Sequence, residues 1–260
     1  MGRGDLSLTY TTDCFYSNPP GFNDSAMSSH LLSLWPRSLS GARALQRKLR
    51  SQVLLSDLHP RIRFLAAADV AYSKREDWAW AGALLFRYPD LELLEEQYVC
   101  FQVMFPYIPG FLSFREGPAL QQVLSRLPPD VDLILFDGQG IAHPQGLGLA
   151  SHLGVTLGKP TIGCAKSQLV GEFKEDLLGE VKGSWVPLLH DGRAVGAVVR
   201  TRTGVKPLYV SPGHLLTLRR SIEVALTCSQ RFRLPEPLRQ VHLRVTRLAR
   251  GGRGDFGLKG

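Results

Sequence analysis

Hydrophobic positions in the first half of the chain fall into three consecutive extended segments. Apolar, aromatic and β-branched side chains fill 61–72, 79–88 and 91–101, and the breaks between these segments are short. The last break contains Pro89-Asp90, which is typical of a tight turn. Extended segments that follow one another through short breaks predict an antiparallel meander of strands.

Beyond this meander the pattern changes to helices that alternate with short apolar runs. The spacing predicts helices over 118–127 and 146–157, and buried strands over 131–136 and 160–165. Strands that are connected through helices pair in parallel, so this part of the chain predicts βαβ units.

The last third of the chain adds shorter elements. Strands are expected in 184–189, 194–201 and 207–211, and helices in 217–230 and 235–250. The chain is therefore predicted to be an α/β protein with a ribonuclease H-like mixed sheet. In that arrangement an antiparallel meander leads into parallel βαβ units, and helices cover both faces.

Both ends of the chain lack such patterns. Residues 1–37 are rich in turn-forming residues, and residues 251–260 are rich in glycine. Segments of this kind are typical of flexible tails. A single folded domain is therefore expected over 38–250.

The first helix of this domain is predicted to be amphipathic. Leu45, Leu49 and Val53 recur at four-residue spacing, which predicts an apolar stripe that faces the core. Basic residues lie between them, and their face is expected to meet water or a phosphate: Arg43, Arg47, Lys48 and Arg50.

The net charge of the chain indicates what kind of partner it binds. The 260 residues contain 31 Lys and Arg against 23 Asp and Glu, which gives a net charge of +8. A basic excess is the first footprint of a phosphate-bearing partner, and a basic protein without such a partner is the alternative. No apolar run approaches the roughly 18 residues of a membrane helix, so no membrane association is expected.

The cysteines and the N-terminus indicate the compartment. Four cysteines lie far apart without a C-x-x-C pair, so neither a zinc site nor a disulfide framework is expected. The N-terminal MGRGDLSLTYTTD has no apolar signal segment. These features predict a reducing, cytoplasmic location.

Two aspartates occupy positions that favour chemistry. Asp69 lies inside an apolar strand, on the same face as Ala67 and Ala71, where an unpaired carboxylate is costly. Asp137 directly follows the strand 131–136 and precedes a glycine-rich loop, which is where α/β sheets bind ligands. The alternatives are a buried ion pair for Asp69 and turn chemistry for Asp137.

Glu116 has a local alternative of its own. Ser113 to Glu116 has the S-x-x-E form of a capping box, in which the glutamate bonds only a backbone amide. Pro118 argues against that role, because proline prefers the first helical position and would fall too deep in a helix capped by Ser113. A helix that begins at Pro118 leaves Glu116 free to point elsewhere.

Together the three carboxylates predict a metal site. Acidic side chains that converge at strand ends bind hard cations such as magnesium, and magnesium can activate water for attack on a phosphodiester. A basic protein with an acidic cluster therefore has what a nuclease needs.

With these residues identified, the chain resembles the endonuclease V family of deoxyinosine-specific nucleases over about residues 45–248. The resemblance is carried by six ordered motifs: ADVAYS, PYIPGFLSFRE, LFDGQGIAHPQGLGLASHLG, IGCAKS, PLYVSPGH and RLPEPLRQVH.

The resemblance implies roles for the polar residues in these motifs. Asp69, Glu116 and Asp137 match the catalytic acids that bind magnesium, with the two aspartates as direct ligands and manganese as a substitute ion. Lys166 matches a lysine near the reacting phosphate, where a fixed cation stabilises developing charge. His242 would complete the metal site or position water. From the residues alone, the alternatives are a surface lysine and a packed helix histidine.

The motif at 106–110 resembles the family's strand-separating wedge. An enzyme that inspects a base within a duplex must take it out of the stack, and Tyr107 is the residue expected to fill the vacated place. Its neighbours Pro106 and Pro109 restrict the backbone. The substrate-binding set is expected to comprise Pro106, Tyr107, Ile108, Pro109, Gly110, Leu112, Gly138, His143 and His214.

The resemblance implies a magnesium-dependent endonuclease that recognises deoxyinosine in DNA and cleaves on its 3′ side, one nucleotide beyond the lesion, to initiate repair. An inosine-specific endoribonuclease on the same scaffold is one alternative, and a non-catalytic nucleic-acid-binding module is another. Gln145 and Leu215 replace arginines that are usual in the family, which predicts changed affinity or salt dependence rather than loss of activity.

Overall fold

In the computed structural model the described residues are 35–36, 38–57, 61–74 and 78–251. The tails expected over 1–37 and 251–260 fall almost entirely outside this part of the chain. None of the described helices is long and apolar enough to cross a membrane.

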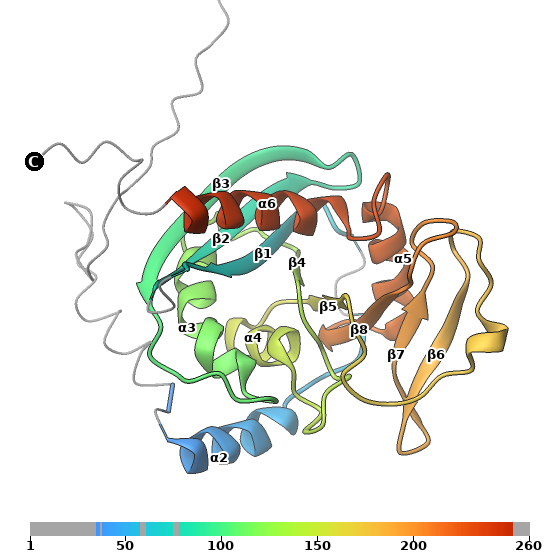
Figure 1. Ribbon diagram of the computed structural model, residues 1–260, viewed down its shortest axis with the longest axis horizontal. Helices are drawn as coiled ribbons and strands as arrows, with labels where there is room; N and C mark the ends of the chain where they lie inside the picture. Colours follow the sequence, from blue (N-terminus) through green and yellow to red (C-terminus); the bar gives the residue numbers. More distant parts are fainter. Residues whose placement is uncertain (1–34, 37, 58–60, 75–77, 252–260) are drawn as a thin grey trace, which may run out of the picture.

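One sheet with helices on both faces makes up the described part of the chain (Figure 1). The helices are α2 (Leu39–Arg50), α3 (Leu112–Leu124), α4 (Leu149–Leu157), the 3-10 turn η1 (Glu175–Leu177), α5 (Leu218–Cys228) and α6 (Glu236–Gly251). The strands are β1 (Phe64–Tyr72), β2 (Trp78–Arg87), β3 (Glu92–Gln102), β4 (Leu133–Phe136), β5 (Thr161–Ala165), β6 (Trp185–His190), β7 (Arg193–Val199) and β8 (Leu208–His214).

The sheet contains both kinds of pairing that the sequence predicts. Its order is β3-β2-β1-β4-β5-β8-β7-β6. β1, β2 and β3 form the antiparallel meander, and β1, β4 and β5 pair in parallel. β8, β7 and β6 then extend the sheet in antiparallel fashion. The predicted mixed sheet of ribonuclease H-like arrangement is confirmed.

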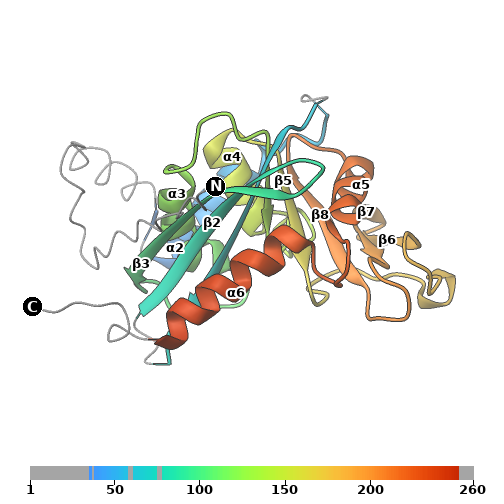
Figure 2. The same ribbon diagram turned by 90° about the horizontal axis from the view of Figure 1, so that it is seen from above.

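Alternation along β1 divides the core into two layers. Ala66, Ala68 and Val70 belong to the layer under α3 and α4. Leu65 and Ala67 belong to the layer under α5 and α6. Figure 2 shows α6 lying across the meander on the side opposite α3 and α4. Residues that are neighbours on β1 therefore point to opposite faces, which places different helices around the end of this strand.

The start of α3 corrects the expected helix boundary. The helix begins at Leu112 and contains Pro118, so neither the predicted start at Pro118 nor a cap by Ser113 is right. The N-cap is Phe111, which makes no side-chain cap bond. Proline inside a helix costs about 3 kcal/mol, but each large buried side chain contributes about 1.5–3 kcal/mol. The burial of Phe114 and Leu120 therefore outweighs the local preference.

The first helix also differs from its prediction. α2 ends at Arg50, so Val53 is not part of its apolar stripe. The amides of Gln52 and Val53 bond carbonyls three residues back, which closes the helix with turns instead of a further α-helical turn. Ala42, Gln46 and Leu49 form its buried face.

Close packing at Gly82 positions α6 against the sheet. Gly82 of β2 lies opposite Asp69 of β1 in the strand register. A Cβ atom at this glycine would lie 2.6 Å from Cγ1 of Val245 and 3.1 Å from Cγ2 of Val241. Both valines belong to α6, so the missing side chain lets this helix approach the sheet beside Asp69.

We expect Gly82→Ala to lower the free energy of unfolding by about 1–3 kcal/mol, because the valine that it meets is β-branched and cannot easily rotate away. Urea denaturation measures this change. Val245→Ala opens space at the same point, so the double variant should lose less stability than the sum of the two single variants. Additive losses would show that α6 is not held by this contact.

Candidate metal centre

The two aspartates meet because their strands are parallel neighbours. Ala68 of β1 pairs with Phe136 of β4, so the next residue of each chain segment, Asp69 and Asp137, continues the same register. Asp69 is still within its strand, whereas Asp137 begins the loop after β4. The predicted position of Asp69 on the face of Ala67 is confirmed by the core layers.

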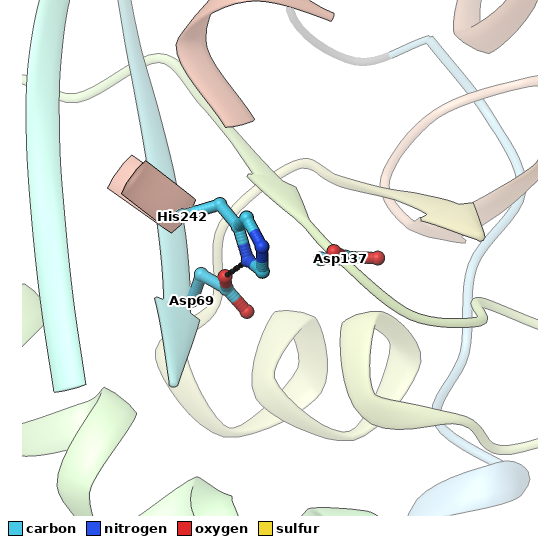
Figure 3. A group of neighbouring side chains, drawn as sticks. All are labelled: Asp69, Asp137 and His242. Atoms are coloured by element: carbon cyan, nitrogen blue, oxygen red, sulfur yellow. Dashed lines mark hydrogen bonds and ion pairs between the residues drawn. The ribbon is translucent and has the colours of Figure 1, made fainter. Parts of the chain in front are cut away.

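His242 completes a group of three side chains. It comes from the middle of α6, and its Nδ1 lies 2.8 Å from Oδ2 of Asp69 (Figure 3). One ligand atom from each of Asp69, Asp137 and His242 lies within 4.8 Å of the others, and among the described residues this is the group able to hold a metal ion. Residues that are far apart in the sequence are thus brought together by β1, β4 and α6.

Burial and hydrogen bonding set the protonation of this group. Burial raises the pKa of Asp69, and the nearby charge of Asp137 raises it further. The hydrogen bond to Asp69 raises the pKa of His242. Both shifts favour the form of each side chain that carries a proton. A divalent cation replaces such a proton, because it favours the ionised carboxylates.

The donor set fits a hard divalent ion. Two carboxylates supply oxygen atoms, which magnesium, calcium and manganese prefer. Asp69 and Asp137 are largely shielded, with 11% and 16% of their side chains exposed. The two anionic groups repel each other at this depth, and a cation between them removes that cost.

Glu116 approaches from the opposite face of the sheet. It is buried in α3, and its Oε1 accepts a hydrogen bond of 2.7 Å from the hydroxyl of Tyr72. Burial raises the pKa of Glu116 to about 8, and the charges of Asp69 and Asp137 contribute to the increase. Glu116 is therefore electrostatically coupled to the centre, although the group of ligand atoms within 4.8 Å is formed by Asp69, Asp137 and His242.

Lys166 lies on the other side of Asp137. It follows β5, and its Nζ donates to Oδ2 of Asp137. Its side chain is 45% exposed, so the ammonium borders both the centre and solvent. The guanidinium of Arg233 donates to the backbone carbonyls of Lys166 and Pro207. Arg233 thus fixes the chain that carries the lysine.

The loop 106–110 protrudes from a buried base just before α3, the helix that carries Glu116. Phe105 and Phe111 flank it, stack on each other and contact the ring of Phe114 at tilted angles in a buried aromatic cluster. Between these anchors Tyr107 is 70% exposed. Gly110 adopts a φ of 81°, which lets the loop turn back into α3. The tyrosine is therefore held out from the surface by a fixed support.

The other predicted residues lie at this loop, directly after Asp137 and beside the segment that follows α2. His143 is buried next to Gly110, where a Cβ atom would be 3.8 Å from its Nε2, and burial lowers its pKa to about 4. Leu112 is the half-buried first residue of α3. Gly138 follows Asp137 directly. His214 is buried, and its Nδ1 accepts from the amide of Leu54, so it supports the segment after α2. The substrate-binding roles stay predictions.

The sequence alone did not single out four further residues. Tyr72 donates a hydrogen bond to Glu116. The guanidinium of Arg115 lies over the ring of Tyr72, 4.7 Å from its centre. Arg233 fixes Lys166 as described. Gln139 donates to the carbonyl of Ser167, and its buried Oε1 is without a partner among the described residues. The available signals were the positions of Tyr72 and Gln139 inside the motifs of Asp69 and Asp137.

Comparisons with known proteins agree with this geometry. The family model described as Endonuclease V matches residues 47–243. The chain is 46% identical over 206 residues to endonuclease V of a Nostoc species, which covers 79% of this chain and 92% of that protein. It is 43% identical over 243 residues to endonuclease V of Gloeobacter violaceus, which covers 93% of this chain and 97% of that protein.

Solved structures show the same relationship. Endonuclease V from Streptomyces avermitilis superposes with a TM-score of 0.77 at 38% identity, over 82% of this chain and 94% of that chain. Ciona intestinalis endonuclease V superposes with a TM-score of 0.72 at 25% identity, over 81% of this chain and 97% of that chain, and was solved with a 24mer DNA that contains an inosine followed by a ribo-adenosine. The chain belongs to the endonuclease V family.

Proposed function

We propose that this protein is a magnesium-dependent endonuclease that recognises deoxyinosine, the product of adenine deamination, in DNA. It cleaves the backbone on the 3′ side of the lesion, one nucleotide beyond it, and so initiates repair. The observation that carries the proposal is the convergence of Asp69, Asp137 and His242 within 4.8 Å of one another. The inosine-containing DNA held by the related Ciona protein supports the substrate.

Magnesium is the proposed ion, with manganese as its substitute, because the carboxylates of Asp69 and Asp137 offer the oxygen atoms that these ions prefer. When bound, such an ion polarises the phosphate and lowers the pKa of water. His242 holds the Asp69 carboxylate in place through its Nδ1. Lys166 places a positive charge at the open side of the centre, where charge develops on the phosphate.

Glu116 is proposed to act as a proton-holding group at the edge of the centre. Its pKa of about 8 lies near neutral pH, where a carboxyl can both accept and release a proton. Tyr72 fixes the orientation of this carboxyl by donating to Oε1. This arrangement supports the role of Glu116 in catalysis that the motif implies.

The loop 106–110 is proposed to separate the strands. Tyr107 is exposed on a loop that is anchored on both sides by buried phenylalanines, so its ring can enter a duplex while its support stays rigid. Pro106 and Pro109 limit the freedom that the loop loses on binding. Gly138, Leu112 and His143 border the same region and are proposed to receive the extruded base.

The direct test is cleavage of a labelled duplex that contains one deoxyinosine, with and without magnesium. We expect cutting that requires the ion and maps to the second phosphodiester on the 3′ side. Asp69→Ala should reduce the rate by at least about a hundredfold, because the ion contributes several kcal/mol to the transition state, while binding of the duplex persists.

Two matched substrates complete this test. A duplex with adenine in place of hypoxanthine should stay intact, and an inosine-containing RNA reports whether the enzyme prefers RNA, since a contact to the 2′-hydroxyl distinguishes the two. Cutting that is independent of the base or the ion would exclude the proposed function. Faster cutting of the RNA would assign the activity to the alternative substrate.

Tyr107→Ala should reduce cleavage of the inosine duplex by about tenfold or more, because one stacking contact with a base is worth roughly 1–3 kcal/mol. Tyr107→Phe keeps the ring and should retain most of the activity. The measurement is the single-turnover rate on a duplex and on the same inosine strand without its complement. If the alanine variant cuts the duplex at the wild-type rate, the loop does not act as a wedge.

The pKa shifts predict a stability that depends on pH and on the ion. Glu116 holds its proton up to about pH 8 in the folded protein but ionises near 4.5 when unfolded. The folded state therefore binds more protons between these values, so metal-free stability falls as the pH rises from 6 to 8. Melting temperatures should show this fall, magnesium should reduce it, and Glu116→Gln should flatten it. A metal-free stability that rises over this range would contradict the shift.

A further inference from the structure

The exposed side of α2 carries a row of arginines that the proposed chemistry does not use. Arg43, Arg47 and Arg50 recur at spacings of four and three residues, so they form one stripe along the helix. All are exposed. The ion pairs found among the described residues include none of these side chains.

This stripe borders the loop that carries Tyr107. Gln46 is buried, and its Nε2 donates a hydrogen bond of 2.8 Å to the carbonyl of Gly110. Arg43 precedes Gln46 by three residues and Arg50 follows it by four, so both lie on the same side of α2 as this bond. The stripe therefore runs along the edge of the helix that faces the loop 106–110.

The same stripe touches the loop that follows Asp137. A Cβ atom at Gly146 would lie 3.0 Å from Nε of Arg50. Figure 1 shows α2 below α4, beside the chain segments that lead into α3 and α4. The helix thus contacts the loop 106–110 through Gln46 and the loop that follows Asp137 through Arg50.

The helix is held firmly enough to present a fixed row of charges. Ser38 caps its first turn through a bond from the amide of Gly41, and Ala42 and Leu49 are buried. From Arg43 to Arg50 the helix advances by seven steps, or roughly 10 Å at 1.5 Å per residue. One strand of a duplex carries a phosphate about every 3.4 Å along its axis, so the row matches about three phosphates.

We infer that the arginine stripe Arg43, Arg47 and Arg50 binds the phosphate backbone of the DNA strand that the loop 106–110 engages. This inference rests on the proposed function and adds a phosphate-binding surface to it. The stripe supplies affinity and register without contacting the reacting phosphate. The occupant is a polyanion because the ion pairs among the described residues include no carboxylate partner for these arginines, whose guanidinium groups offer bidentate donors suited to phosphate.

The test compares neighbouring residues of α2 that carry the same charge on different sides of the helix. Arg47 lies on the stripe, whereas Lys48 is one residue further around the helix and away from Gln46. Arg47→Gln and Lys48→Gln remove the same charge from the same helix. Binding of the full-length chain to a fluorescent inosine duplex is measured without magnesium over a range of salt concentrations, and single-turnover and steady-state cleavage are measured with it.

We expect Arg47→Gln to weaken binding more than Lys48→Gln and to reduce the slope of log Kd against log salt by about 1. The triple variant Arg43→Gln, Arg47→Gln, Arg50→Gln should weaken binding by at least about tenfold and reduce the slope by about 2 to 3. Its kcat should stay close to the wild-type value while KM rises, because the stripe holds the backbone and does not act at the reacting bond.

A second triple variant controls for total charge. Arg193→Gln, Arg247→Gln and Arg250→Gln remove equal charge from exposed positions on β7 and the last part of α6. If both triple variants lose the same affinity for the duplex, or if Arg47→Gln and Lys48→Gln do, the effect is one of total charge and the inference is wrong. If the first triple variant has the salt slope of the wild-type protein while the wild-type protein still cuts inosine DNA, the inference is wrong and the proposed function stands. A wild-type protein that does not cut inosine DNA would remove the proposed function and this inference together.

Discussion

The repulsion among carboxylates at the end of β1 is the constraint on which the rest of the structure depends. Asp69, Asp137 and Glu116 lie in a shielded region, where the charge of Asp137 raises the pKa of Asp69 and the charges of both aspartates raise the pKa of Glu116. Every neighbour of the centre offsets part of this cost. His242 and Lys166 pair with the aspartates, and Tyr72 donates to the glutamate. Burial in such a cluster favours the protonated forms of Asp69 and Glu116, whereas a bound cation favours the ionised carboxylates.

The fold meets this constraint by using both faces of one strand. Asp69 points towards α6 and forms a hydrogen bond with His242. Tyr72 points to the face of the sheet that α3 covers, and it donates a hydrogen bond to Glu116. Side chains three residues apart on a strand lie on opposite faces, so β1 collects partners from both helical layers. Gly82 has no side chain, so α6 can pack directly over β2 next to Asp69. The centre is therefore a product of tertiary packing and not of any single motif.

This origin explains what the sequence could and could not predict. Asp69 and Asp137 were found because strand alternation and strand ends are local patterns, and their convergence follows from parallel pairing of β1 with β4. The start of α3 was missed because Pro118 is a strong local signal, whereas the burial of Phe114 and Leu120 is decided by the sheet beneath them. Arg233 carried no local signal, because its role is to hold the carbonyl of Lys166, which lies far away in the sequence.

The protein has a positive net charge, whereas its metal centre is acidic. This difference in sign couples the binding of DNA to the binding of the ion. A net charge of +8 attracts a polyanion over a distance comparable to the Debye length, about 8–10 Å at physiological salt. At the centre, however, the phosphate of the proposed substrate would meet Asp69 and Asp137, which repel it when they are ionised. A cation held by these carboxylates reverses the sign of the local field, so DNA and the ion each favour the binding of the other. The basic surface therefore delivers the backbone to the centre, and the acidic centre makes its close approach conditional on the ion.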